Sequence, residues 1–112
     1  MEHRTSSRTL LRQQVRFDSA RDGSRSAYTH DVSLGGMFVE TEPVRLPPNT
    51  SLKVSFALPQ NGKGERVFVL DAAVVRVAAN GLGLMFLQMD PEQIRTLSEA
   101  LAAQHEPPHA PN

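Results

Sequence analysis

Residues 52–87 read LKVSFALPQNGKGERVFVLDAAVVRVAANGLGLMFL, and this stretch decides the fold class. From Leu52 to Leu58 large apolar side chains alternate with polar or small ones, which is typical of a β-strand with one buried face. The turn sequence Asn61-Gly-Lys-Gly64 follows, and asparagine and glycine tolerate the positive φ angles that tight hairpins require. We therefore expect a β-hairpin at the centre of the chain.

The strand after this hairpin is long and apolar, and a further strand follows it. Glu65–Ala78 is too long to stay straight, so we expect a bulge or bend, marked by Asp71. Asn80-Gly81 predicts a second tight turn, and Leu82–Leu87 predicts the last strand. Gly83 lacks a side chain, which allows another group to approach its backbone closely.

Three more strands are expected on the amino-terminal side of residue 52. Val15 and Phe17 alternate with polar residues in the first, while 26–33 and 37–41 predict two more on either side of Gly35-Gly36. Six antiparallel strands in so short a chain favour closure, because closure removes exposed strand edges. The sequence therefore predicts an all-β protein with a six-stranded antiparallel barrel.

A single helix is expected after the strands. Asp90 is a suitable amino-terminal cap, Pro91 suits the first helical position, and Gln93 is able to complete a capping box. Ile94, Leu97 and Leu101 fall on one face and predict that the helix docks on the barrel. The expected organisation is a flexible amino-terminal arm at 1–7, one domain at 8–104 and a disordered tail at 105–112.

The charge of the chain sums to zero over 112 residues, with 12 basic and 12 acidic side chains. Residues 1–30 hold six arginines and three acids, a net +3, whereas residues 31–112 hold six basic residues and nine acids, a net −3. A neutral total argues against a protein that coats nucleic acid. The chain contains no cysteine, no apolar signal segment at its start and no run long enough to cross a bilayer, so we expect a cytoplasmic protein.

Candidate ligand-binding side chains lie in two short motifs. Arg8 and Arg12, four residues apart, would share one face of a helix or belong to a flexible arm, and arginine suits phosphates and the O6/N7 edge of guanine. Asp31 and Ser33 would share one face of a strand, where the carboxylate is able to accept the N–H donors of guanine. Gly35 and Gly36 would let a base or phosphate approach the backbone.

Each motif also has an interpretation without a ligand. The arginines alone are more simply a solvated charged arm, and Asp31 with Ser33 would serve to form a turn. Gly35 and Gly36 require a special backbone conformation under either interpretation. Arg76 lies between two valines and is expected to be an outward-facing surface residue.

Taken together, the motifs resemble those of the PilZ domain, a family of bacterial receptors for the second messenger cyclic di-GMP. Arg8-xxx-Arg12 followed by Asp31-x-Ser33-x-x-Gly36 matches the paired signature of that family. Arg12-Gln-Gln-Val-Arg-Phe17, Val74-Val-Arg-Val77 and Gly81-Leu-Gly-Leu-Met-Phe86 also resemble strands of the family. The resemblance covers roughly residues 8–100.

The resemblance implies a PilZ-type β-barrel with a carboxy-terminal helix. It also implies that Arg8 and Arg12 bind the phosphates and guanines of cyclic di-GMP from a mobile arm, while Asp31, Ser33, Gly35 and Gly36 receive one guanine. The expected function is a receptor and adaptor whose arginine arm orders on ligand binding and signals through an unidentified effector protein. The alternative is a PilZ-like protein-interaction module that does not bind nucleotide.

Other classes of function receive less support from the sequence. His30, Asp31 and Ser33 suggest a hydrolase, but in a regular strand His30 points away from the other two. The four histidines show no spacing typical of metal ligands, and we expect no metal and no cofactor. A barrel that binds single-stranded nucleic acid would need aromatic platforms in a basic groove, which the acidic part of the chain does not offer. We therefore expect no enzyme, no nucleic-acid polymer as partner and no membrane insertion.

Overall fold

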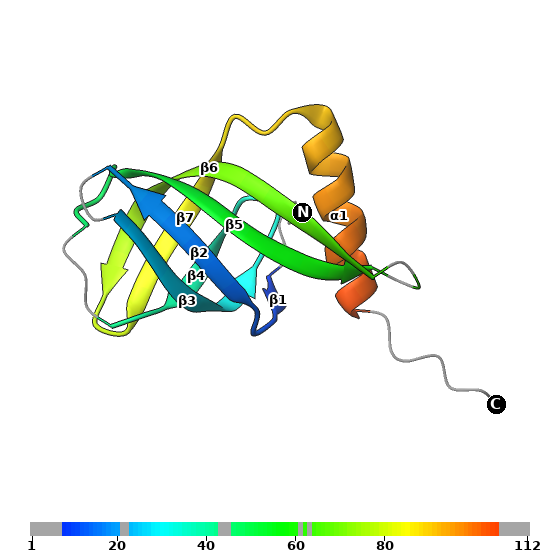
Figure 1. Ribbon diagram of the computed structural model, residues 1–112, viewed down its shortest axis with the longest axis horizontal. Coiled ribbons are helices and arrows are strands. Elements are labelled where there is room, and N and C mark those ends of the chain that lie inside the picture. Colours follow the sequence, from blue (N-terminus) through cyan, green and yellow to red (C-terminus); the bar gives the residue numbers. More distant parts are fainter. Residues whose placement is uncertain (1–7, 21–22, 43–45, 61, 63, 106–112) are drawn as a thin grey trace, which may run out of the picture.

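The computed structural model describes residues 8–20, 23–42, 46–60, 62 and 64–105 (Figure 1). The predicted arm at 1–7 and residues 106–112 of the predicted tail lie outside the described residues, as do Asn61 and Lys63 of the predicted hairpin. The helix extends to His105, the first residue of that predicted tail. The described elements are β1 (Thr9–Leu10), β2 (Gln14–Ser19), β3 (Gly23–Val32), β4 (Gly36–Glu40), β5 (Ser51–Gln60), β6 (Gly64–Ala78), β7 (Gly81–Leu87) and α1 (Pro91–His105).

The strands form one antiparallel sheet that closes on itself. Their order is β1-β3-β2-β5-β6-β7-β4, and an additional pairing between β3 and β4 closes the barrel. The six strands β2 to β7 make the barrel, and β1 is added to β3 outside it. The predicted six-stranded barrel is therefore confirmed, with one short strand that the sequence did not reveal.

Strand β1 continues the line of β2 along the same edge of β3. Thr9 lies opposite Val32 and Leu10 opposite Asp31, whereas β2 pairs with the earlier part of β3, from Gly23 to Tyr28. Residues 11–13 form a break between the two strands. The amino-terminal segment at Thr9–Leu10 is thus extended and paired, neither the helix nor the free arm that its arginine spacing allowed.

The alternating apolar side chains of residues 52–58 form one buried face of β5, as predicted. Leu52, Val54, Phe56 and Leu58 are all buried, and Phe56 stacks on Phe68 of β6 with 5.4 Å between ring centroids. Burial of such side chains stabilises a fold by about 1.5–3 kcal/mol each. The β5–β6 hairpin therefore supplies much of the barrel core.

The bulge in β6 lies further along the strand than predicted. Asp71 is in regular register with Lys53 of β5 and Leu87 of β7, and its carboxylate pairs with the Lys53 ammonium at 3.0 Å. An outward-facing acid with a cross-strand partner needs no distortion of the strand. The register shift instead lies between Val74 and Arg76, opposite β7.

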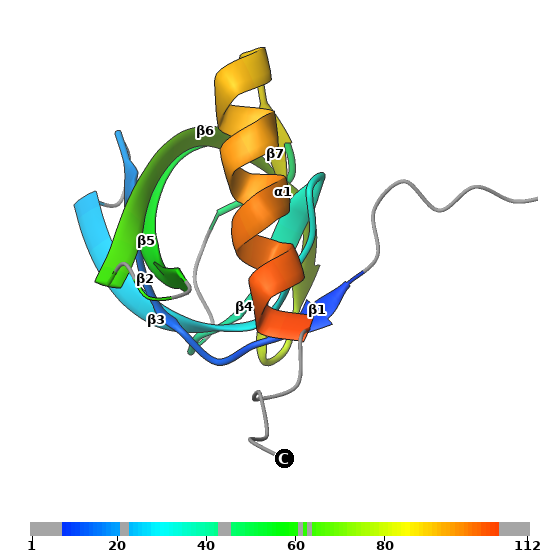
Figure 2. The same ribbon diagram turned by 90° about the vertical axis from the view of Figure 1, so that its right-hand side faces the viewer.

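Helix α1 begins with the predicted capping box. The Gln93 backbone N–H donates to Asp90 Oδ1 at 2.8 Å, and the Asp90 N–H donates to Gln93 Oε1 at 3.0 Å. Leu97 and Leu101 are buried as predicted, but Ile94 is 42% exposed, because Thr96 and Ala100 face the barrel in its place. The helix lies across one end of the barrel and packs on β5 (Figure 2).

Among the described residues, no helix combines the length and the apolar character needed to cross a bilayer.

Candidate functional site

A bulge in β3 turns Asp31 to the outer face of the barrel. Thr29 lies opposite Val39 and Asp31 opposite Phe38, so His30 is an extra residue with no partner on β4. Thr29 and Val39 point into the core, and strict alternation would send Asp31 there too. The inserted residue moves Asp31 to the side that Phe38 occupies.

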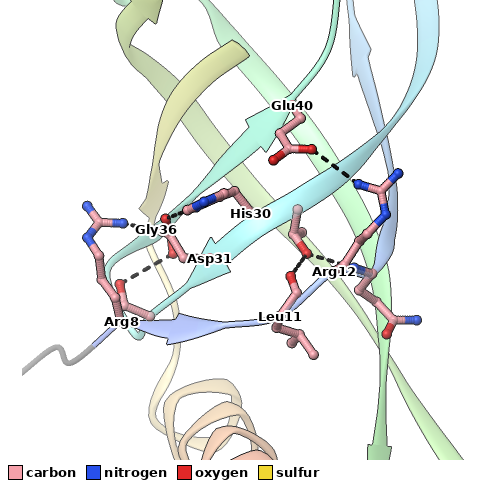
Figure 3. Close-up of polar contacts among 10 residues, drawn as sticks. Arg8, Leu11, Arg12, His30, Asp31, Gly36 and Glu40 are labelled. Carbon is pink, nitrogen blue, oxygen red and sulfur yellow. Dashed lines mark hydrogen bonds and ion pairs between the residues drawn. The ribbon is translucent and has the colours of Figure 1, made fainter. Parts of the chain in front are cut away.

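The Asp31 carboxylate has two cationic or polar neighbours. The Arg8 guanidinium donates to Oδ1, and His30 Nδ1 lies 2.9 Å from Oδ2 (Figure 3). The Asp31 side chain is only 9% exposed, whereas that of Arg8 is 64% exposed. Asp31 is therefore a largely covered acceptor beneath an accessible arginine.

The position of His30 corrects the sequence argument against a catalytic triad. In a regular strand the imidazole would point away from Asp31, but the bulge brings the two side chains into contact. The Ser33 hydroxyl, however, bonds within a turn, to the Gly36 carbonyl at 3.3 Å and from the Gly35 N–H at 3.2 Å. The three residues do not form the serine–histidine relay that nucleophilic catalysis needs.

The turn from Ser33 to Gly36 connects β3 to β4 and is explained by hydrogen bonding and strand packing. The Ser33 N–H donates to the Gly36 carbonyl at 2.8 Å, which closes the connection between β3 and β4. A Cβ at Gly36 would lie 2.0 Å from the Leu84 carbonyl oxygen of β7. Gly36 does not adopt a positive φ, so the predicted special conformation is wrong there, and close packing of two strands explains the glycine.

Arg12 lies in the break between β1 and β2. Its guanidinium lies over the Tyr28 ring, 4.2 Å from the centroid, and 3.2 Å from Glu40 Oε1. The buried Thr29 hydroxyl supports the break, because it accepts from the Gln13 N–H at 2.9 Å and donates to the Leu11 carbonyl. Arg8 and Arg12 therefore contact different acids.

Three of the six predicted residues, Arg8, Arg12 and Asp31, line two neighbouring hollows. The first, which we call the Asp31 groove, has a volume of about 330 Å³ and is lined by Arg8, His30, Asp31, Phe38, Arg76 and Asn80. The second, the Arg12 hollow, has a volume of about 380 Å³ and is lined by Leu10, Leu11, Arg12, Thr29, His30 and Glu40. His30 borders both, and Ser33, Gly35 and Gly36 line neither.

Four residues of the Asp31 groove were not predicted to bind a ligand. His30 was considered only as part of a catalytic triad. Phe38 and Asn80 were not candidates, and Arg76 was expected to be a plain surface residue. Arg76 Cζ lies 5.3 Å from the centroid of the Phe38 ring. The sequence signal that points to this contact is Gly83, which lies opposite both Phe38 and Arg76 on the strand between them.

The groove is a mixed electrostatic site. It contains two guanidinium groups, one carboxylate and one imidazole. Within the part of the chain that the structure describes, no three histidine, aspartate or glutamate side chains are grouped to hold a metal ion. The arrangement suits a small ligand with anionic groups and N–H donors.

Comparison with known proteins supports the resemblance. The sequence profile of the family described as "PilZ domain" matches residues 2–103. No curated protein sequence matches this chain.

Solved structures share the fold. The PilZ domain of CeSA from a cellulose-synthesizing bacterium is 18% identical, with a TM-score of 0.73 over 90% of this chain and 100% of that one. The PilZ domain of YcgR from Escherichia coli, solved with c-di-GMP, is 20% identical, with a TM-score of 0.69 over 92% of each chain. The Bacillus subtilis inhibitor of motility, MotI/DgrA, is 16% identical, with a TM-score of 0.75 over 93% of this chain and 50% of that one.

Proposed function

Because this chain belongs to the PilZ domain family, we propose that it is a receptor for cyclic di-GMP. The dinucleotide would bind in the Asp31 groove and the adjoining Arg12 hollow, and the receptor would signal through a protein partner. The structure of the YcgR domain with c-di-GMP supports this ligand class. The observation that carries the proposal is the meeting of Arg8 and Asp31, one from each motif, at the edge of one groove.

The chemistry of a guanine fits these two side chains. Its Watson–Crick edge presents the N1–H and the 2-amino group, which two carboxylate oxygens of Asp31 are able to accept. Its O6 and N7 atoms, and the phosphates of the dinucleotide, suit the planar donor fork of arginine. We assign the Asp31 carboxylate to the Watson–Crick edge of one guanine, and Arg8 and Arg12 to the phosphates and the other guanine.

Ser33, Gly35 and Gly36 have an indirect role in this proposal. The Ser33 hydroxyl is already bonded within the turn, and Gly36 is packed against Leu84. These residues fix the end of β3, and with it the direction of the Asp31 carboxylate. They line neither hollow and would not donate to the ligand from a side chain.

Ligand binding would change the surface around β1. Thr9 and Leu10 are already paired with β3, so from residue 8 onward the predicted ordering is limited to the exposed side chains of Arg8 and Arg12. Fixing one such side chain costs about 1.5–2 kcal/mol, far less than ordering a free segment of about ten residues. An unidentified effector protein would recognise the rearranged arginines.

The proposed ligand also bears on where the protein acts, on catalysis and on nucleic-acid partners. A receptor for a bacterial second messenger acts in the cytoplasm, and we propose a regulatory role without catalysis, metal or cofactor. We propose no nucleic-acid polymer as partner, because Phe17, Phe56, Phe68 and Phe86 are buried in the core and unavailable for base stacking.

The test is a calorimetric titration with cyclic di-GMP, using one matched pair of variants. Arg8→Ala should abolish binding, whereas Arg16→Ala should not. The Arg16 side chain is 63% exposed and ion-paired to Asp18, close to the 64% exposure of Arg8, but it lies outside both hollows. No heat of binding from the folded, unaltered chain would sink the proposal.

One observation favours the alternative of a module that binds protein alone. Arg8 and Asp31 form an ion pair with each other without a ligand. The pair would therefore also be explained as a structural contact that holds β1 against β3. Under that alternative, cyclic di-GMP gives no heat of binding with either the unaltered chain or Asp31→Asn, and Asp31→Asn loosens the pairing of β1 with β3.

A further inference from the structure

Phe38 and Arg76 form the wall of the Asp31 groove that lies away from β3. Phe38 stands on β4, between His30 on one side and Arg76 on the other. The His30 ring meets it edge to face, with 6.3 Å between centroids, and Arg76 Cζ lies 5.3 Å from its centroid. The groove is therefore lined in turn by Asp31, the Phe38 ring and Arg76.

Gly83 makes this contact between non-adjacent strands possible. Phe38 of β4 lies opposite Gly83 of β7, which in turn lies opposite Arg76 of β6. Neighbouring strands lie about 4.8 Å apart, so a side chain at residue 83 would stand between the ring and the guanidinium. A Cβ there would already lie 3.2 Å from the Arg76 Cβ.

Arg76 differs from the other arginines of the site in its partners. Arg8 and Arg12 are ion-paired with Asp31 and Glu40 respectively. Arg76 is exposed, and among the described residues no acid lies within ion-pair distance of it. One face of its guanidinium is covered by Phe38, while the N–H edge and the other face remain free to meet a ligand.

We infer that Arg76 contacts the O6/N7 edge of the guanine whose Watson–Crick edge meets Asp31. The inference rests on the proposed function and names a residue that selects the base. The donor edge of guanine would face the carboxylate, and its acceptor edge would face the arginine across the groove. Adenine carries an amino group in place of O6, which would oppose the N–H donors of Arg76.

A base contact and a phosphate contact require different properties of residue 76. A phosphate needs a positive charge, which lysine also supplies. The guanine edge needs two parallel donors from a planar fork, which lysine does not have. Arg76→Lys therefore distinguishes the two roles.

The experiment compares the affinity for cyclic di-GMP of the unaltered chain, Arg76→Gln, Arg76→Lys and Arg66→Gln. Arg66 is a matched control, because it is an exposed arginine of the same strand that lines neither hollow. We expect Arg76→Gln and Arg76→Lys each to weaken binding by about tenfold or more, the value of a good bidentate base contact. Arg66→Gln should bind as the unaltered chain does, and all four should share one melting temperature.

A second arm measures selectivity with cyclic di-AMP. Glutamine is able to bond the N6/N7 edge of adenine, so Arg76→Gln should narrow the preference for cyclic di-GMP over cyclic di-AMP. Full affinity in Arg76→Gln overturns the inference, and so does rescue by Arg76→Lys. If the unaltered chain takes up neither dinucleotide, it is the proposed function that fails.

Discussion

Arg8 and Asp31 are separated by 23 residues in the chain, yet the guanidinium of one donates a hydrogen bond to the carboxylate of the other. The pair joins the segment before β1 to the bulge of β3. Each partner carries the group that cyclic di-GMP would use, so the ligand must compete with a contact that the protein already makes. This competition should limit the affinity. High ionic strength should also weaken binding, since salt screens the attraction between the exposed arginines and the phosphates of the ligand.

Asp31→Asn should weaken cyclic di-GMP binding by at least about tenfold while changing the free energy of unfolding by less than about 1 kcal/mol. The amide keeps one acceptor but loses the charge and the second oxygen. Asp18→Asn is the control, because Asp18 is paired with Arg16 away from both hollows. Calorimetric titration and thermal unfolding measure the two quantities, and equal affinities for both variants would contradict the role given to Asp31.

Thr29→Val should destabilise the protein by about 1–3 kcal/mol, because it leaves the Gln13 N–H and the Leu11 carbonyl without their partner. It should also weaken ligand binding, since Arg12 lies in the break that this hydroxyl supports. Thr50→Val removes an exposed hydroxyl that donates to the Pro47 carbonyl. It should lower the free energy of unfolding by less than Thr29→Val and leave ligand binding unchanged. Denaturant unfolding compares the two variants, and an equal loss of unfolding free energy in both would contradict the role given to the Thr29 hydroxyl in supporting the break between β1 and β2.

Gly36→Ala should lower the free energy of unfolding by about 3 kcal/mol, since the new methyl group meets a backbone oxygen that is held in a strand. Gly23→Ala is the control. Gly23 has open space but a φ of +74°, so alanine there costs only about 1–2 kcal/mol of backbone strain. If Gly36→Ala melts like the unaltered chain but fails to bind cyclic di-GMP, Gly36 serves the ligand and not the packing of the barrel.

Gly83→Val should weaken binding to about the same extent as Arg76→Gln, because its side chain would separate Arg76 from Phe38. The two changes act on one contact, so the double variant should bind no more weakly than either single variant. Affinities from a double-mutant cycle test this. Additive losses would mean that Gly83 and Arg76 act independently.

Local sequence patterns predicted the parts of the fold that depend on local physics. The alternation from Leu52 to Leu58 gave a strand with one buried face, and Asp90 with Gln93 gave the start of the helix. The burial of Ile94 was wrong, because the helix face that docks is chosen by the shape of the barrel end and not by the helix alone. The short strand β1 was missed because two residues carry no recognisable period.

The candidate site depends on pairings between distant strands, which sequence periodicity does not contain. The bulge at His30 is defined only by the register of β3 on β4, and the bulge after Val74 only by the register of β6 on β7. The two motifs identified Arg8 and Asp31, which do meet in one groove. Arg76 and Phe38 escaped notice because only the strand between them, with Gly83 in the right place, brings them together.

The extra residue in β3 means that strand register, as much as residue type, creates this surface. A chain with His30 deleted would keep every member of both motifs, and each would still match a sequence pattern. Thr29 would stay opposite Val39 and Asp31 opposite Phe38, so regular alternation would keep the Asp31 carboxylate on the outer face, and the deletion would remove only the imidazole beside it. A chain that kept His30 but paired it regularly with β4 would instead turn the Asp31 carboxylate toward the apolar interior, where an unpaired charge is not tolerated. The two motifs alone therefore do not place the acid on the surface.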